Sequence, residues 1–275
     1  MNGNETSSAR RPTDSAYLLD NAGREAPTRF AALSAMFDPG TIRHLEERGV
    51  TKGWQCLEVG GGGGSIAAWL GERVGPSGRV VATDIDPRFL ETLKLPNVEV
   101  RRHNIVTDPL PDATFDLVHA RLVLVHLVEW EKVLRKLVAA LKPGGWLIAE
   151  EFDSHSAPPD PMLSPGEILL KTHVAMGRLM AERGFERHYG RLLFGRLRAQ
   201  GLMSVGAEGR MFMVQCGSPG ASLVRANYEQ LREAMIDPGY ITHQEFENDL
   251  ARLSDPDFMM PSSIMWSVWG HRPSV

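Results

Sequence analysis

Five consecutive glycines are the residues whose type and spacing indicate chemistry most directly. They occupy positions 60–64, between the apolar strand pattern of residues 54–59 and the amphipathic helix pattern of residues 65–74. Glycine adopts positive φ without strain and has no Cβ, so such a turn lets a ligand approach the backbone closely. The helix that begins there directs free N–H groups to the same point, which favours a carboxylate or a phosphate. The pattern predicts a strand, a ligand-binding turn and a helix, because a flexible linker would not lie between two such elements.

Two nucleotide-type ligands fit the spacing of these glycines. Gly60, Gly62 and Gly64 follow Glu58 in a Glu-x-Gly-x-Gly-x-Gly pattern. Gly62, Gly64 and Ala67 also satisfy the Gly-x-Gly-x-x-Ala fingerprint of dinucleotide-binding turns. The glycines alone therefore leave the choice of ligand open.

The composition is that of a globular protein with a sizeable core. The chain has 275 residues, of which 43% are hydrophobic and 23% charged, with a formal net charge of -4. We therefore expect neither nucleic acid nor an anionic membrane as a partner. The N-terminus lacks the apolar segment of a signal peptide, and no apolar run is long enough to cross a bilayer, which predicts a cytoplasmic protein.

The cysteines and histidines predict neither a disulfide nor a metal site. Cys56 and Cys216 lie in strand-like apolar runs and are expected to be buried free thiols. No cluster of cysteine and histidine has the spacing of metal ligands. Most of the methionines in the second half lie in strand patterns and are expected in the core, namely Met203, Met211, Met213, Met259, Met260 and Met265.

Strand patterns alternate with helix patterns in the first half of the chain. Strands are expected at residues 79–84, 98–102, 115–119 and 146–150. Helices are expected at residues 16–35, 41–48, 86–93 and 130–141, with a turn at 38–40. This alternation predicts right-handed crossovers and a mainly parallel sheet.

The second half departs from this alternation. A capping box that begins at Ser164 predicts a helix to about residue 183, and another helix is expected at 191–200. Strands at 203–215 and 264–271 then flank two more helices. Their predicted N-termini are Ser218-Pro219 and the Thr242-x-x-Glu245 box.

Over about residues 16–272 the chain resembles the class I S-adenosylmethionine-dependent methyltransferases, in particular the bacterial small-molecule, ubiquinone/menaquinone-biosynthesis-like group. The residues that carry the resemblance are Glu58 to Gly64, Asp84 at the end of the second strand, Phe115-Asp116-Leu117-Val118, and Leu141-Lys142-Pro143-Gly144-Gly145. It implies an α/β, Rossmann-like, doubly wound sheet of seven strands. The sheet would be mostly parallel with an antiparallel final strand, and lid helices would be inserted in it. Together these motifs favour the methyl donor over a dinucleotide.

The resemblance divides the chain into five parts. Residues 1–15 are expected to form a disordered tail. The others are N-terminal helices that cover the active site (16–50), a cofactor-binding Rossmann-like core (51–153), lid helices (154–202) and the last two strands with inserted helices, which complete the same sheet (203–275).

The resemblance also assigns residues to S-adenosylmethionine and its product S-adenosylhomocysteine. Glu58, Gly60, Gly62 and Gly64 would lie under the methionine part of the cofactor. Asp84 would bind the ribose, since two carboxylate oxygens suit a vicinal diol.

Further contacts are expected at the ends of the next strands. Ile85 would pack on the adenine, and Asn104-Ile105 occupies a position where the family often has Asp-Ala and would meet the adenine amino group. Ala120 and Arg121 end the fourth strand. Arg121 would either approach the cofactor carboxylate or pair with Glu129.

Methyl transfer from a sulfonium requires alignment and exclusion of water more than a nucleophilic residue. His126, near the methyl-transfer face, is a candidate general base, or it packs the short helix there. His155 is a second candidate, or a solvated loop residue. Tyr17 would either cover the active site or anchor its helix.

The expected function is methyl transfer to an O, N or C nucleophile of a small organic molecule by in-line displacement. The inserted helices favour a small acceptor, since a macromolecule needs an open face; a homodimer is allowed. Two alternatives remain: an NAD(P)-dependent oxidoreductase, and a protein that binds S-adenosylmethionine without transferring its methyl group.

Overall fold

A seven-stranded sheet is the centre of the fold. The structure, a computed structural model, describes residues 18–154 and 170–274. The order of the strands is β3-β2-β1-β4-β5-β9-β6. Their bounds are β1 (Gln55–Val59), β2 (Arg79–Asp84), β3 (Val98–Arg102), β4 (Phe115–Arg121), β5 (Leu141–Asp153), β6 (Met203–Arg210) and β9 (Ile264–His271).

The directions of the strands agree with the predicted fold class. β1, β2, β3, β4 and β5 pair in parallel, whereas β9 runs antiparallel between β5 and β6. The sheet is thus mostly parallel with an antiparallel final strand, and the prediction is confirmed.

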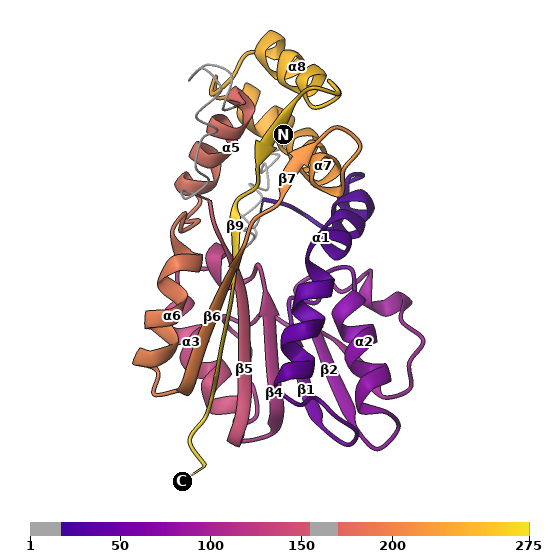
Figure 1. The fold of residues 1–275 in the computed structure, drawn as a ribbon, viewed down its shortest axis with the longest axis vertical. Helices are drawn as coiled ribbons and strands as arrows, with labels where there is room; N and C mark the ends of the chain where they lie inside the picture. The colour runs from indigo at the N-terminus through magenta and orange to yellow at the C-terminus, as the bar shows by residue number, and fades with distance from the viewer. Residues whose placement is uncertain (1–17, 155–169, 275) are drawn as a thin grey trace, which may run out of the picture.

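Helices cover both faces of the sheet (Figure 1). α1 (Ala26–Glu47) and α2 (Ser65–Val74) pack on the face that presents Cys56, Leu117 and Ile148, residues of one apolar cluster with Leu45 and Leu70. α3 (Trp130–Ala140) and α6 (Tyr189–Ala199) pack on the opposite face, where Leu57, Val118 and Leu147 form a second cluster with Leu134 and Leu193. Alternate residues of each strand therefore serve different layers.

A third apolar cluster lies beyond the carboxyl ends of the parallel strands (Figure 1). It is built from α5 (Lys171–Glu182), α7 (Pro219–Ile236), α8 (His243–Arg252) and a two-stranded sheet of β7 (Met213–Gln215) and β8 (Met259–Pro261). Ser218 caps α7, and Thr242 with Glu245 forms the capping box of α8, at the predicted positions. This helical cap covers the edge of the sheet where ligands of α/β proteins bind.

Several predicted elements were wrong. Residues 26–47 form one helix with Pro39 inside it, where a turn was expected. The helix continues because Phe37 is fully buried and the Thr41 hydroxyl bonds to Glu150 of the sheet, and such contacts outweigh the local cost of proline. The helix predicted after Asp86-Pro87 is only the 3₁₀ turn η1 (Leu90–Thr92).

The predicted strand 203–215 divides into β6 and β7, which belong to different sheets. β7 and β8 pair only with each other, and their side chains alternate between the two faces of this small sheet. Val214 and Met260 therefore pack into the cap, while Met213 and Met259 face solvent. Met203 and Met211 are also exposed, so the expectation of a buried position holds only for Met260 and Met265. Cys216 is exposed as well, because the strand ends before it; Cys56 is buried.

Tyr17, His155 and the capping box at Ser164 lie outside the described residues.

Candidate functional site

A cavity of about 550 Å³ lies between the carboxyl ends of the parallel strands and the helical cap. One end is formed by the glycine turn and by residues that follow β2, β3 and β4. The other end is formed by α1, α5, α7 and the segment after β8. The side chains at this second end are mostly apolar, and include Leu33, Phe37, Phe152, Met176, Met180, Phe185, Leu223 and Met260.

The glycine turn has a backbone that only glycine adopts easily. Gly60, Gly62 and Gly64 have φ of 65°, 49° and 85°. A Cβ at Gly60 would lie 2.4 Å from Cγ2 of Val123, and one at Gly62 would lie 2.6 Å from Cε1 of Phe30. Both the conformation and the contacts therefore exclude side chains here.

Asp84 ties the end of β2 to this turn. Its Oδ2 accepts a hydrogen bond from Gly62 N at 3.0 Å, and its Oδ1 accepts one from Asp86 N at 2.9 Å. The carboxyl is buried, and burial raises its pKa. Beside it, Ile85 lines the cavity although its side chain is 44% exposed. A buried carboxylate and an exposed apolar side chain thus meet at one wall of the cavity.

Asn104 and Ile105 line the same end, beyond β3. Asn104 Oδ1 accepts a hydrogen bond from Val106 N at 3.0 Å, and this bond fixes the side-chain amide. Ala120, in contrast, is fully buried in the core on the face of α3 and α6 and does not line the cavity. The alternation of β4 turns its side chain away from the cavity, and its assignment to the cofactor stays a prediction.

Arg121 lines the cavity but is held by α1. Its guanidinium forms an ion pair with Asp38 at 2.8 Å and donates to the Thr41 hydroxyl at 3.0 Å. Glu129, its predicted surface partner, pairs instead with Lys132 at 3.2 Å. That alternative was wrong because α1 lies over the end of β4.

Glu58, the acidic residue before the glycines, lines the cavity and is paired with a buried histidine. Its Oε2 lies 2.6 Å from Nδ1 of His119, and Nε2 of His119 lies 3.4 Å from Oε2 of Glu150. Sequence reasoning missed this arrangement. The available signal was that each of the three is a polar residue inside an otherwise apolar strand pattern.

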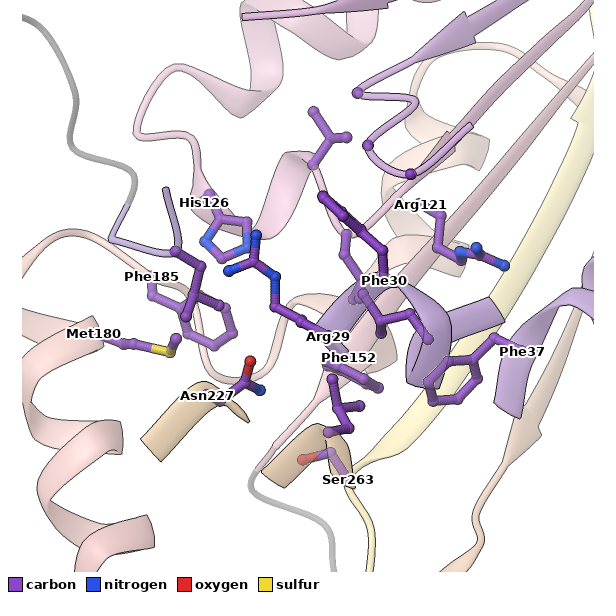
Figure 2. Close-up of a pocket in the computed structure, with 18 of the residues that line it drawn as sticks. Arg29, Phe30, Phe37, Arg121, His126, Phe152, Met180, Phe185, Asn227 and Ser263 are labelled. Carbon is purple, nitrogen blue, oxygen red and sulfur yellow. The ribbon is translucent and has the colours of Figure 1, made fainter. Parts of the chain in front are cut away.

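His126 lies at the end of the 3₁₀ turn η2 (Leu124–His126) and lines the cavity. Its ring packs edge-on against Phe185, with 5.2 Å between ring centroids. Burial and the nearby Arg29 lower its pKa to about 4, so the imidazole is neutral at pH 7. Figure 2 shows the side chain of Arg29 directed toward His126.

Glu151 holds η2 in place. The carboxyl accepts hydrogen bonds from Leu124 N at 2.7 Å and from Val123 N at 3.1 Å. Burial raises its pKa to about 8, above the ordinary carboxyl value. The turn that carries His126 is thus positioned by a carboxyl that is largely neutral at pH 7.

α1 supplies two residues of the site that the sequence reasoning did not select. Arg29 is buried and donates to Oδ1 of Asn21 at 3.2 Å, and Phe30 lies over the glycine turn. In Figure 2 both point into the cavity, as does Asn227 from α7. Amphipathic spacing alone gives no reason to prefer them over other residues of the helix.

Tyr17 and His155 cannot be placed, since they lie outside the described residues. Among residues 18–154 and 170–274, no group of histidine, cysteine, aspartate and glutamate could hold a metal ion. Within the same ranges, no helix has the length and hydrophobicity needed to cross a bilayer.

The chain matches a family model described as a methyltransferase domain over residues 57–149. It is 32% identical over 140 residues to a methyltransferase of Strobilurus tenacellus, covering 50% of each chain. It is 34% identical over 151 residues to the ubiquinone/menaquinone biosynthesis C-methyltransferase of Enterobacter sp. (strain 638), covering 51% of this chain and 59% of that protein. The chain thus spans about half the length of the curated relatives it matches.

A structural neighbour extends the likeness of fold beyond this segment. The phosphoethanolamine N-methyltransferase 2 of Haemonchus contortus, in complex with phosphomonomethylethanolamine and S-adenosylhomocysteine, aligns with a TM-score of 0.57. It covers 93% of this chain and 59% of that one at 13% identity, which shows the fold alone. The family match and the fold identify residues 57–149 as a methyltransferase domain of the class I S-adenosylmethionine-dependent kind, as predicted from the sequence, and its similarity to curated relatives includes the ubiquinone/menaquinone-biosynthesis group.

Proposed function

We propose that the chain is a methyltransferase that transfers the methyl group of S-adenosylmethionine to a small, largely apolar organic molecule in the cytoplasm. The observation that carries the proposal is the single cavity that joins the glycine turn and Asp84 to a chamber lined by apolar side chains. Two ligands bound at the two ends would lie in one continuous cavity.

The residues at the first end fit S-adenosylmethionine. Asp84 supplies the two acceptor oxygens that a ribose diol requires, and Ile85 supplies an exposed apolar surface for adenine. The glycine turn leaves its backbone uncovered by side chains of its own. Glu58 Oε1 accepts no hydrogen bond from the described residues and is available to an ammonium group.

The bound cofactor supplies a methyl group on a positively charged sulfur, which is already a good leaving group. The protein's part is to align the acceptor with that methyl group and to exclude water. Phe37, Phe152, Phe185 and the methionines of α5 form the walls that do this. The apolar walls favour an acceptor with little charge, since burying an unpaired charge there is costly.

His126 is the best-placed candidate base among the described residues. Its pKa is lowered to about 4, so the imidazole is neutral at pH 7 and has a ring nitrogen free of a proton, although as a base it is weaker than an ordinary histidine. The acceptor atom, whether O, N or C, is left to experiment. Tyr17 and His155 stay predictions.

The test is parallel calorimetric titration with S-adenosylmethionine, S-adenosylhomocysteine and NAD, followed by transfer of a labelled methyl group to a panel of phenols, amines and enolisable ketones. We expect binding of the first two ligands, no binding of NAD, and transfer to at least one acceptor class. Binding of NAD alone would establish the oxidoreductase alternative. Binding of S-adenosylmethionine without transfer to any acceptor would favour the protein that keeps it as a ligand only.

Replacement of His126 by glutamine tests its role separately. We expect kcat to fall about 100-fold or more for a hydroxyl acceptor, while the affinity for S-adenosylhomocysteine stays unchanged. An unchanged kcat would show that His126 only packs against Phe185.

A further inference from the structure

A row of buried polar side chains crosses the sheet below the cavity. Glu58 and His119 are paired residues on the adjacent strands β1 and β4, and Glu150 and Ser267 are paired residues on β5 and β9. The side chains of Glu58, His119, Glu150 and Ser267 are 4% exposed or less. They lie on the face covered by α1, where an apolar layer would ordinarily be expected.

The hydrogen bonds along the row fix the charge of His119. Nδ1 faces Glu58 at 2.6 Å and Nε2 faces Glu150 at 3.4 Å. A neutral imidazole has only one N–H, whereas the imidazolium has two and can donate to both carboxylates. Arg210 also pairs with Glu150, at 3.2 Å. With His119 protonated, the two carboxylates are matched by two cations; with His119 neutral, one buried negative charge is left over.

The charged groups around the row have partners of their own, although Arg121 also acts on Glu150 and Glu208 lies 3.7 Å from Arg210. Arg121 pairs with Asp38 at 2.8 Å, and Arg43 pairs with Glu208 at 2.5 Å. His44, which approaches from α1, is buried, and burial together with Arg43 lowers its pKa. None of these groups replaces His119 as the cation between Glu58 and Glu150.

The row connects the two ends of the cavity. Glu58 immediately precedes Val59 and the glycine turn, whereas Glu150 accepts a hydrogen bond from Thr41 of α1. α1 also closes tightly on the row, since a Cβ at Gly40 would lie 1.1 Å from Nη1 of Arg210. The same helix carries Arg29, Phe30 and Phe37 into the cavity.

We propose that His119 is a positioning residue: as an imidazolium between Glu58 and Glu150, it fixes the position of the glycine turn relative to α1. It thereby sets the distance between the end of the cavity at the glycine turn and Asp84, the cofactor end, and the apolar chamber, the acceptor end. The link to the cofactor rests on the proposed function; the link between the turn and α1 does not. His119 touches neither ligand, and acts through Glu58 on one side and through Glu150 and Thr41 on the other.

The charge of His119 gives the protein a pH dependence that can be measured. The two carboxylates outweigh burial and raise its pKa to about 9, from the ordinary value of 6.5. Between these pH values the folded protein holds a proton that the unfolded chain has lost, so this contribution to stability is complete below pH 6.5 and is lost as pH rises through 9. His119→Gln removes this contribution.

The experiment compares the wild type, His119→Gln, Glu150→Gln and the double variant His119→Gln/Glu150→Gln. Unfolding temperature is measured from pH 6 to pH 10, together with amide exchange of residues 26–41 and 60–64 and the affinity for S-adenosylhomocysteine. We expect the unfolding temperature of His119→Gln to decline less steeply than that of the wild type between pH 6.5 and pH 9, because only the contribution of His119 is removed. The variant should also exchange faster in both segments and bind S-adenosylhomocysteine about five- to tenfold more weakly at pH 7. The double variant restores charge balance with Arg210, so it should be less destabilised than the sum of the single variants.

His44→Gln is the matched control, since it removes another fully buried imidazole under the same helix. It should lower stability without removing the decline above pH 6.5 and without changing exchange in residues 60–64. The proposal is overturned if the wild type and His119→Gln decline in parallel between pH 6.5 and pH 9. It is also overturned if exchange changes in only one of the two segments.

Failure of the proposed function has a different signature. In that case the wild type does not bind S-adenosylhomocysteine at all, while unfolding and amide exchange still decide whether His119 couples the turn to α1. If the wild type binds and His119→Gln binds equally well with faster exchange, the positioning role toward the cofactor is refuted.

Discussion

The two ends of the cavity are built in different ways. The end proposed for the cofactor is made of residues that directly follow strands: Gly60 after β1, Ile85 after β2 and Asn104 just beyond β3. The acceptor end combines segments from opposite ends of the chain, from Phe37 in α1 to residues 260–263, which lie in β8 and directly after it.

This difference has a physical origin. Parallel strands deliver the loops at their carboxyl ends to one edge of the sheet, so a short motif after a strand lies near the others whatever covers it. The acceptor end has no such constraint, because its shape depends on how α1, α5 and α7 pack over that edge. Substitutions at the cofactor end should therefore change mainly the affinity for S-adenosylhomocysteine. Substitutions at the acceptor end should change mainly the KM for the acceptor.

The largest effect is expected at the glycine turn. Gly62→Val introduces a β-branched side chain at φ 49°, where a Cβ would lie 2.6 Å from Phe30. We expect binding of S-adenosylhomocysteine to become undetectable by calorimetry, since backbone strain of about 1 to 3 kcal/mol adds to the steric clash. Gly239→Ala is the control, because Gly239 also has positive φ but no atom within 4 Å of a Cβ. Retained affinity in Gly62→Val would contradict the position of the cofactor.

Asp84→Asn tests the carboxylate while it preserves an acceptor for Gly62 N. We expect the affinity for S-adenosylhomocysteine to fall by about 1 to 3 kcal/mol, because the charged acceptor of the ribose hydroxyls is lost. The affinity for an acceptor substrate should hardly change. Asp86→Asn, at a neighbouring carboxyl that does not line the cavity, should leave both affinities unchanged. Equal losses in the two variants would remove the assignment of Asp84 to the ribose.

Phe185→Ala should produce the opposite pattern. Phe185 packs against His126 and lines the acceptor end, so its removal should raise the KM for an apolar acceptor about tenfold. The affinity for S-adenosylhomocysteine should stay within about a factor of two, because substitutions at distant sites without shared partners have nearly independent effects. Phe194→Ala, on the exposed side of α6, is the control for loss of a phenyl ring. A change in cofactor affinity without a change in KM would erase the distinction between the two ends.

The last prediction concerns pH and the neighbours Glu150 and Glu151, which face opposite sides of the sheet. For Glu150, His119 and Arg121 outweigh burial and lower its pKa to about 2, whereas burial raises the pKa of Glu151 to about 8. Between pH 4.5 and pH 8 the folded protein keeps the proton of Glu151, whereas the unfolded chain has lost it. The stability that this proton contributes is therefore complete below pH 4.5 and is lost as pH rises through 8.

Glu151→Gln should remove this decline, which amounts to at most about 1.4 kcal/mol per pH unit. Denaturant unfolding from pH 4.5 to pH 8 measures it, with Glu129→Gln as the exposed control. If Glu151→Gln declines with pH as the wild type does, the carboxyl that positions His126 is ionised rather than neutral.

Much of the fold and of the cofactor end was determined by local sequence. Five glycines after a strand, Asp84 at the end of the next one, and the caps at Ser218 and Thr242 each depend on a few adjacent residues. Steric limits on φ and the free N–H groups of helix ends act within such short segments. Residue type and spacing therefore suffice to predict them.

Only the tertiary structure decided the pairing of buried charges and the course of α1. Nothing adjacent to His119 in sequence indicates Glu58 or Glu150, since strand order, not chain distance, makes them neighbours. Arg121 pairs with Asp38, 83 residues away, because α1 lies over β4. Pro39 remains inside a helix because contacts with the sheet outweigh its local preference. Electrostatic and packing energies depend on distance in space, which the order of residues leaves undetermined until the sheet and its covering helices are in place.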